Sequence, residues 1–463
     1  MTIPRVLLGL LIVIALFAAA FVAYAWRLEI APVERPAPTG FDRAQVSRGR
    51  ALAAIGNCAT CHTADGGMVL AGGRPFKTPF GTLYSPNITP DAETGIGRWS
   101  QAAFARAMRE GVDREGRHLY PAFPYDHFTQ VTDADNQALY AYLMSQAPAK
   151  ALSPPNALAF PFNVRMTVAA WKLLYFKQGP YRQDRAQNAN WNRGAYLVEG
   201  LAHCGACHTP RNILGAEKPS ERFDGADIDG WHAYAINARS AAPTPWTAEA
   251  MALYLRSGWH QAHGMARGPM APVVENLAAV PIEDTRAIAT YIAATTERAR
   301  PGGKVAGPVA GSRRPMPASA DSLVSPRDVP AGSSDAGAKI YAAACATCHE
   351  AGRPLPFGGI DLAHSTAIHG ESPRNLINVT LYGLPATAGE ASAIMPGFRA
   401  SLTDPQIASL VHYLRADIAK KPAWPGVEPM IREARSSDTA PPLYTTPGTQ
   451  GAPNDPSQGG VAW

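Results

Sequence analysis

Three separated stretches of the chain repeat apolar residues at three- and four-residue spacing, which predicts three amphipathic helices. They run from Asp133 to Met144, from Glu283 to Ala293 and from Pro405 to Leu414. Each carries an aromatic residue on its apolar face, namely Tyr140, Tyr291 and Tyr413. A threonine begins two of these patterns: Thr132 to Asp135 resembles a capping box, and Thr403 to Gln406 fits that pattern better.

A shorter helical pattern beginning near a glycine precedes each of these helices along the chain. The segments are "RGRALAAIGN", "RGAYLVEGLAH" and "AGAKIYAAA". A unit of one early and one late helix therefore occurs three times, which is the signature of an internal repeat. We place the units at residues 41–150, 188–298 and 334–420.

The longest apolar run extends from Val6 to Trp26 between Arg5 and Arg27, and it contains no charged residue. About 20 apolar residues in a helix span the hydrocarbon core of a bilayer, and Tyr24 and Trp26 suit its interface. We therefore predict a transmembrane anchor at residues 5–27. A cleaved signal peptide is the alternative, because Ala23-Tyr24-Ala25 has the small-x-small form of a cleavage site. No other stretch is long enough to cross a bilayer.

The segments between and after the units differ in character. Residues 151–187 form a proline-containing bridge whose apolar part, Met166 to Phe176, packs on the first unit or lies on a membrane or a partner. Residues 299–333 are rich in Pro, Gly, Ala and Ser and predict a flexible linker that lets the third unit move. Residues 421–463 predict a Pro/Gly-rich tail without a fold of its own.

Composition fits globular units rather than an all-membrane protein. Apolar residues make up 46% and charged residues 17% of the chain, with 42 Pro and 41 Gly. The formal net charge is +5, which gives no reason to expect a nucleic-acid partner. The fold class we expect is all-α.

All 6 cysteines lie in Cys-x-x-Cys-His units, one at the same place in each repeat. This unit is the attachment signature of c-type haem, in which two thiols bind the porphyrin and the histidine becomes an iron ligand. A closed zinc site needs four ligands, and no second cysteine pair lies near any copy. A thioredoxin-like motif would need a strand-helix-strand setting, which the sequence around the three copies does not suggest.

We therefore predict three covalently bound c haems. The predicted haem-binding residues are Cys58, Cys61, His62, Cys204, Cys207, His208, Cys345, Cys348 and His349. Because c-type haem is attached outside the cytoplasmic membrane, the haem domains belong in the periplasm. Pro210, just after His208, is a candidate to accept the imidazole N–H of that histidine through its carbonyl.

The second axial ligand of each iron should come from the loop before the late helix. Met395 in "ASAIMPGF" fits this position in the third unit, and Met270 in "GPMAPVV" fits it in the second, with Met265 as a competitor. A thioether ligand raises the reduction potential of the iron.

The first unit has Phe123 at the corresponding position, and phenylalanine cannot bind iron. His127 is the nearest donor and is the metal ligand we predict for the first haem. His118, Met108, and an open or water-bound iron are alternatives. We interpret His203, His364, His369 and His412 as structural.

Several motifs together resemble those of a known family. They are "GTLYSPNITPDAETGIGRWS", "REGVDREGRHLYPAFPY", "GAYLVEGLAHCGACHTPRN" and "MPGFRASLTDPQIASLVHYLR". Over roughly residues 40 to 420 the chain resembles the triple-haem cytochrome subunits of membrane-bound periplasmic dehydrogenases. The resemblance implies tandem class I cytochrome c domains.

Two branches of that family differ in their catalytic partner. The first serves quinoprotein alcohol dehydrogenases or flavoprotein sugar-acid dehydrogenases and normally has Tyr-Pro-Ala-Met-Pro-Tyr in the first unit. The second serves molybdenum hydroxylases that oxidise aldehydes, nicotinate or isoquinoline. Phe123, the sequence "YDHF" and the N-terminal anchor resemble the second branch.

The function that this resemblance implies is electron transfer. A catalytic partner, with molybdopterin and iron–sulfur subunits favoured over a quinoprotein, would deliver electrons for ubiquinone or a terminal oxidase in the membrane. The chain has no catalytic constellation of its own, so we expect a non-catalytic component of an oxidoreductase complex. A haem enzyme with an open first haem, or a soluble electron shuttle if the leader is cleaved, are the alternatives.

Overall fold

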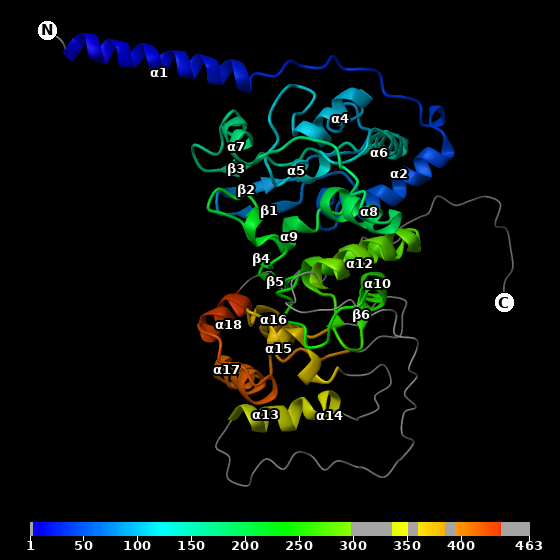
Figure 1. Ribbon diagram of the computed structural model, residues 1–463, viewed down its shortest axis with the longest axis vertical. Coiled ribbons are helices and arrows are strands. Elements are labelled where there is room, and N and C mark those ends of the chain that lie inside the picture. Colours follow the sequence, from blue (N-terminus) through cyan, green and yellow to red (C-terminus); the bar gives the residue numbers. More distant parts are fainter. Residues whose placement is uncertain (1–2, 298–335, 351–359, 385–393, 437–463) are drawn as a thin grey trace.

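The computed structural model describes residues 3–297, 336–350, 360–384 and 394–436. Pairs of packed helices lie one below the other along the long axis of the molecule, with α1 extending from the upper end (Figure 1). The predicted linker at 299–333 lies outside the described residues.

Each of the three predicted units contains an early helix, a turn of helix at the Cys-x-x-Cys-His motif and a late helix. In the first unit the helices are α2 (Arg43–Ile55), α3 (Cys58–His62), α4 (Gln101–Glu110), α5 (Tyr125–Phe128) and α6 (Asp133–Ser145). In the second they are α8 (Ala189–Tyr196), α9 (Gly205–His208), α10 (Ala248–Ser257), α11 (Ala271–Ala278) and α12 (Ile282–Glu297). In the third they are α13 (Ala336–Ala344), α14 (Ala346–His349), α15 (Thr366–His369), α16 (Arg374–Tyr382), α17 (Asp404–Tyr413) and α18 (Val427–Ser436). Outside the units lie α1 (Ile3–Ala25) and α7 (Thr167–Tyr175).

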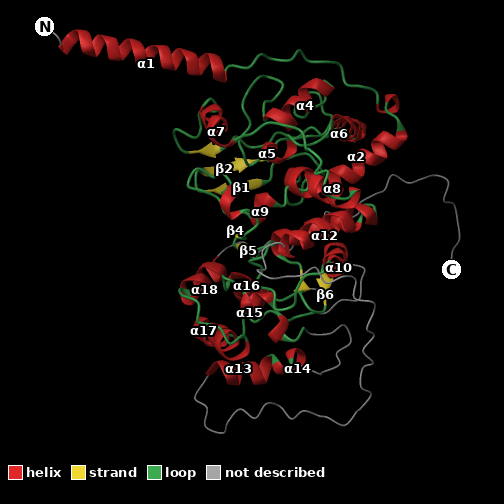
Figure 2. Cartoon of the chain, viewed as in Figure 1, coloured by secondary structure: helices red, strands yellow, loops and turns green. Residues whose placement is uncertain are grey.

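Short antiparallel strands show that the all-α expectation is wrong (Figure 2). The strands are β1 (Pro75–Thr78), β2 (Gly81–Tyr84), β3 (Ala157–Leu158), β4 (Ala226–Ile228), β5 (Trp231–Ala233), β6 (Trp259–His260) and β7 (Gly264–Met265). They pair as β1-β2-β3, β4-β5 and β6-β7, with Phe76 opposite Leu83 in the first sheet. Strands of two to four residues are too short to show a period of two in the sequence.

The early and late helices of every unit cross at a glycine. A Cβ atom at Gly49, Gly194 or Gly337 would collide with the backbone carbonyl of Ala138, Ala287 or Ser409 on the late helix. The Cβ atoms of Tyr142, Tyr291 and Tyr413 lie beside the same three glycines. Tyr142 is therefore the counterpart of Tyr291 and Tyr413 in the first unit, while Tyr140 is buried and donates to the Trp99 carbonyl. Only glycine permits this contact of backbone with backbone.

Both predicted N-terminal caps are present. The Thr132 hydroxyl accepts a hydrogen bond from the Asp135 amide at the start of α6. At the start of α17, Thr403 and Gln406 form a reciprocal capping box, with 2.9 Å between the Thr403 amide nitrogen and the Gln406 Oε1. Each cap satisfies amide groups that the first helical turn leaves without a partner.

One apolar core extends through the first two units, and a separate core holds the third. Leu52, Leu139, Leu201 and Ile288 belong to the shared core, so α2, α6, η2 (Leu197–Leu201) and α12 contribute to the same buried cluster. The third core includes Ile377, Ile407 and Val411 together with Trp424, Val427 and Ile431. The first two units thus stabilise each other through apolar burial.

Two predicted boundaries change. The bridge at 151–187 joins the first unit, because β3 pairs with β2 and α7 buries Val168 and Ala169. The predicted structureless tail at 421–463 instead begins with an ordered segment, since Trp424 and the buried face of α18 complete the third core. The sequence analysis did not predict α18, because Pro429 interrupts its amphipathic pattern.

The third unit contacts the second through α16. The Asn375 side chain accepts from the His232 amide and donates to the His232 carbonyl, both at 2.8 Å. Asn378 donates to the Gly230 carbonyl at 2.9 Å. These bonds cap the edge of the β4-β5 hairpin and fix the contact between the two units.

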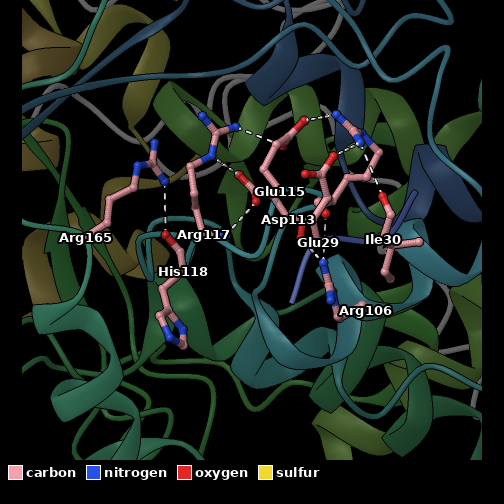
Figure 3. A network of polar contacts seen from close by, with 9 residues as sticks. Glu29, Ile30, Arg106, Asp113, Glu115, Arg117, His118 and Arg165 are labelled. Atoms are coloured by element: carbon pink, nitrogen blue, oxygen red, sulfur yellow. Dashed lines mark hydrogen bonds and ion pairs between the residues drawn. The ribbon is translucent and has the colours of Figure 1, made fainter. Parts of the chain in front are cut away.

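The chain that follows α1 is bound to the first unit by a polar network (Figure 3). Arg114 pairs with Glu29 at 2.7 Å, and its carbonyl accepts from the Ile30 amide. Arg106 donates to the Leu28 carbonyl at 2.7 Å. His118 reaches the carbonyl of Ala25, the last residue of α1, at 2.8 Å, and Ala25 is buried. The C-terminal end of α1 is therefore part of the folded domain.

We predict that Gly194→Ala strongly destabilises the protein, because the new methyl group would collide with the Ala287 carbonyl. Overpacking of this kind costs about 1–3 kcal/mol or more. Gly179→Ala is the matched control, since nothing lies within 4 Å of a Cβ atom at that position. Thermal unfolding followed by circular dichroism measures both, and equal melting temperatures would contradict the role of this crossing.

Candidate haem centres

Each Cys-x-x-Cys-His motif begins where an early helix ends. The residues between the crossing glycine and the first cysteine form about two helical turns, so each motif emerges beside the crossing. None of the 6 cysteines is in a disulfide, so each Sγ is available for a bond to a porphyrin.

The three motif histidines share one hydrogen-bonding arrangement. The Nδ1 atoms of His62, His208 and His349 lie 2.7, 2.7 and 2.8 Å from backbone carbonyl oxygens. A carbonyl only accepts, so each Nδ1 carries the proton and the lone pair of the neutral ring is on Nε2. This is the tautomer and the orientation that an iron ligand needs. The residues therefore fit a haem at each motif.

The carbonyl acceptors lie 24, 26 and 11 residues after His62, His208 and His349. They belong to Pro86, Tyr234 and Ile360. The expectation that Pro210 serves His208 is wrong, because the Pro210 carbonyl accepts the Lys218 amide instead. The acceptor for His208 is therefore Tyr234, which the fold brings close, and not Pro210, which is close in the sequence.

A continuous cavity of about 320 Å³ joins the second and third motifs. Cys204, Cys207 and His208 line one part, and Cys345 and His349 line another. Met270 and Met395, the two predicted distal ligands, both line this cavity, and so does Met265. The two motifs thus face a shared apolar space, which favours closely spaced cofactors.

Sequence reasoning missed His263, which lies in the same cavity. Its ring stacks on Trp246 with centroids 3.4 Å apart, and neither ring nitrogen has a hydrogen-bond partner among the described residues. Burial, with His260 nearby, lowers the pKa of His263 to about 4, so the ring is neutral at pH 7. Its position two residues before Met265 was the available signal.

The first motif has no methionine at the position of Met270 or Met395. Phe123 is half-buried against the shared core, and its ring meets that of Phe128 at 5.2 Å. Met108 is buried in that core. His118 has partners at both nitrogens, the Ala25 carbonyl and the Lys172 ammonium.

His127 lies next to the second motif. Its Nδ1 is 2.7 Å from the Glu199 carbonyl and its Nε2 is 2.8 Å from Glu217 Oε1. The imidazole would be 3.0 Å from a Cβ atom on Gly205, inside the second motif. Both nitrogens are therefore engaged away from the first motif, which counts against His127 as a ligand of the first haem.

Asp126, His127 and Glu217 have oxygen and nitrogen atoms close enough for a metal ion. An imidazole with acceptors at both nitrogens is better described as a protonated ring. Burial alone would lower the pKa of His127, but the hydrogen bond and charge of Glu217 outweigh it and raise that pKa. The same ion pair overcomes burial to lower the pKa of Glu217. This pair joins the first unit to the loop after the second motif.

The second unit also contacts the first motif directly. Asn276, on α11, donates to Asn57 Oδ1 at 2.8 Å and to Thr60 Oγ1 at 3.2 Å, and Thr60 is inside the first motif. His203 Nε2 lies 3.3 Å from the Gly56 carbonyl. The first motif is thus held against the second unit, whereas the second and third motifs share a cavity.

These features define the class of protein as a cytochrome c. The family described as cytochrome c matches residues 46–147, and that described as cytochrome c oxidase, cbb3-type, subunit III matches residues 332–414. Both matches contain a Cys-x-x-Cys-His motif, so covalently bound haem c follows.

The chain belongs to the family of cytochrome subunits of dehydrogenases. It is 37% identical to the fructose dehydrogenase cytochrome subunit of Gluconobacter japonicus, over 88% of this chain and 86% of that one. It is 34% identical to the cytochrome c subunit of the quinone alcohol dehydrogenase of Gluconacetobacter polyoxogenes, over 88% and 86%.

A third relative belongs to the nicotinate dehydrogenase of Pseudomonas putida, as one of the subunits of that enzyme. The identity is 46% over 90% of this chain, and the match covers 34% of the relative. The chain therefore spans about a third of the length of that protein.

We predict that His127→Ala leaves the optical spectrum of the first haem unchanged and destabilises the fold by about 2–3 kcal/mol. The substitution removes the hydrogen-bonded partner of Glu217, which keeps only the longer ion pair with Arg211 at 3.7 Å. Loss of a low-spin haem signal would instead make His127 a ligand. Spectra of the ferric protein and urea unfolding measure the two effects.

The pH dependence follows from the two shifts. The stability that His127 contributes is complete below its ordinary pKa of 6.5 and is lost as the pH rises through its raised value. The contribution of Glu217 is complete above 4.5 and is lost below its lowered value. The stability difference between wild type and His127→Ala is therefore greatest at about pH 5–6.5. A difference independent of pH would contradict the ion pair.

Proposed function

We propose that the chain is the electron-transfer subunit of a periplasmic dehydrogenase and carries three covalent c haems in tandem cytochrome c domains. A c-type haem supplies a one-electron Fe(III)/Fe(II) couple. The observation that supports the count of three is the threefold recurrence of one arrangement: a glycine helix crossing, a Cys-x-x-Cys-His turn and a histidine whose Nδ1 donates to a carbonyl.

In this proposal the cysteine pairs hold the porphyrins and each motif histidine binds iron through Nε2. Met270 and Met395 are the proposed distal ligands of the second and third irons, since both line the shared cavity. The apolar lining keeps water away from the cofactors, which favours small reorganisation on electron transfer. We propose no distal ligand for the first iron. Because Phe123 cannot bind iron, a haem enzyme with an open first haem is a second candidate for the function.

We propose that α1 is retained as a membrane anchor with the haem domains in the periplasm. The apolar span runs from Val6 to Ala25. The end of this span is integrated into the first unit, because Ala25 is buried and its carbonyl is bonded to His118. Leu28, Glu29 and Ile30 continue the attachment.

The favoured catalytic partner is a molybdenum-containing dehydrogenase that oxidises an aldehyde or an N-heterocycle, with ubiquinone or the respiratory chain as acceptor. The 46% identity to the relative from nicotinate dehydrogenase supports this branch, together with Phe123 in place of methionine. A quinoprotein alcohol dehydrogenase or a flavoprotein sugar-acid dehydrogenase is the alternative, supported by the relatives at 37% and 34% identity.

We predict that the intact exported chain carries three haems through thioethers, formed when each S–H adds across a vinyl group. The mass of the denatured protein should include three haems that acid-acetone does not extract. Cys345→Ala with Cys348→Ala should remove one of the three while the other two remain. A mass with fewer than three in the wild type would overturn the proposal.

Purification of the tagged chain from its native membranes tests the partner. We predict that molybdopterin and iron–sulfur subunits co-purify and that their substrate reduces the c haems. Reduction of the c haems by that substrate excludes adventitious co-purification. A quinoprotein or flavoprotein subunit in their place would assign the chain to the other branch.

A further inference from the structure

An apolar surface lies around α7, outside the haem centres. Its exposed members are Phe160, Phe162, Leu173, Leu174, Ile213 and Leu214, and we call it the α7 surface. Phe160, Leu174 and Ile213 are 80%, 69% and 93% exposed. Isolated exposed apolar residues are normal, whereas exposed apolar residues gathered on one face are typical of an interaction site.

The α7 surface is continuous although its residues come from distant segments. The ring of Phe162 lies 4.6 Å from that of Phe80 in the turn between β1 and β2. Trp171, on α7, donates to the Leu214 carbonyl at 3.0 Å. The 160–164 segment, α7 and the 213–214 loop are therefore held as one face.

Polar contacts on the inner side of α7 fix which side faces outward. The buried Lys172 donates to the carbonyls of Glu110 and Gly111 at 2.5 and 2.8 Å, at the C-terminal end of α4. A lysine amine at that end of a helix donates to carbonyls that lack partners, although burial lowers the pKa of Lys172 to about 7. Because Lys172 holds α7 by this side, Leu173 and Leu174 remain exposed.

The same contacts place α7 at the foot of α1. Lys172 Nζ lies 3.1 Å from His118 Nδ1, and the Nε2 of that histidine is 2.8 Å from the Ala25 carbonyl. A single side chain thus connects α7 to the last residue of α1, and the two helices are neighbours (Figure 1). The α7 surface begins where the apolar helix enters the domain.

Charge in this part of the chain is of one sign. Residues 157–183 contain no Asp or Glu, and their basic side chains outside the buried Lys172 are Arg165, Lys177 and Arg182. Lys177 and Arg182 are exposed. Apolar side chains flanked by basic ones are the pattern of segments that lie in the interface of a membrane with anionic lipids.

We propose that the α7 surface rests in the interfacial layer of the bilayer that α1 spans, on anionic phospholipid. The inference depends on the proposed retention of α1. If α1 were the only attachment, the first unit could rotate relative to the membrane about the C-terminal end of α1. Contact through α7 as well orients the domain against the membrane, with Trp171 and Tyr175 at the depth that interfacial aromatic rings prefer.

Photolabelling from the lipid tests this proposal on the full chain with its haems attached. The protein is reconstituted into phosphatidylethanolamine/phosphatidylglycerol vesicles that contain a phospholipid with a diazirine on its acyl chain. We expect labelled peptides from α1 and from residues 160–175. Leu173→Glu with Leu174→Glu should lower labelling of residues 160–175 about tenfold, the effect of placing charge in an apolar interface.

Leu253→Glu is the matched control, since Leu253 is 52% exposed on α10 and lies outside the α7 surface. It should leave the labelling unchanged. Replacing phosphatidylglycerol by phosphatidylcholine should reduce labelling of residues 160–175, and no change would overturn the preference for anionic lipid.

The possible failures are distinguishable. Labelling of α1 without residues 160–175 would overturn the membrane contact while leaving the anchor intact. Absence of label from both would overturn the retained anchor and the contact with it. Protection of residues 160–175 when the catalytic subunits are added would make the α7 surface a protein interface instead. The haem content of the same sample tests the electron-transfer function separately.

Discussion

The close crossing of an early and a late helix at a glycine is the constraint on which the haem centres depend. At Gly49, Gly194 and Gly337 the backbones of the two helices are in contact, so each early helix can pack on the late helix in only one position. The Cys-x-x-Cys-His motif follows directly in the chain, so the packing of the early helix also fixes where the motif lies. Carbonyls of Pro86, Tyr234 and Ile360 then fix the ring of each motif histidine. Packing places the ligand, and one hydrogen bond selects its tautomer.

Contacts between the units convert three local sites into one assembly. A shared core and the His127–Glu217 pair join the first unit to the second. The Asn375 contacts and the common cavity join the second to the third. Each junction includes groups beside a Cys-x-x-Cys-His motif. The distances between the three candidate haem sites are therefore set by the same contacts that stabilise the fold.

Much of the architecture followed from local patterns. The late helices, the caps at Thr132 and Thr403 and the apolar N-terminal helix were predictable because each depends on residues within a few turns. The short strands, α18 and the inclusion of the bridge in the first unit were not, because their stability comes from partners far away in the chain. Local patterns carry little information about such partners.

The attachment chemistry could be predicted from each motif alone, since a cysteine pair and its histidine lie within five consecutive residues. The surroundings of each motif depend on the packing of segments from elsewhere in the chain. This packing gave His208 the carbonyl of Tyr234 rather than that of Pro210, and it gave His127 two protein acceptors beside the second motif. It also placed His263 in the shared cavity. These outcomes depend on which distant segments pack together, and spacing along the chain does not encode that.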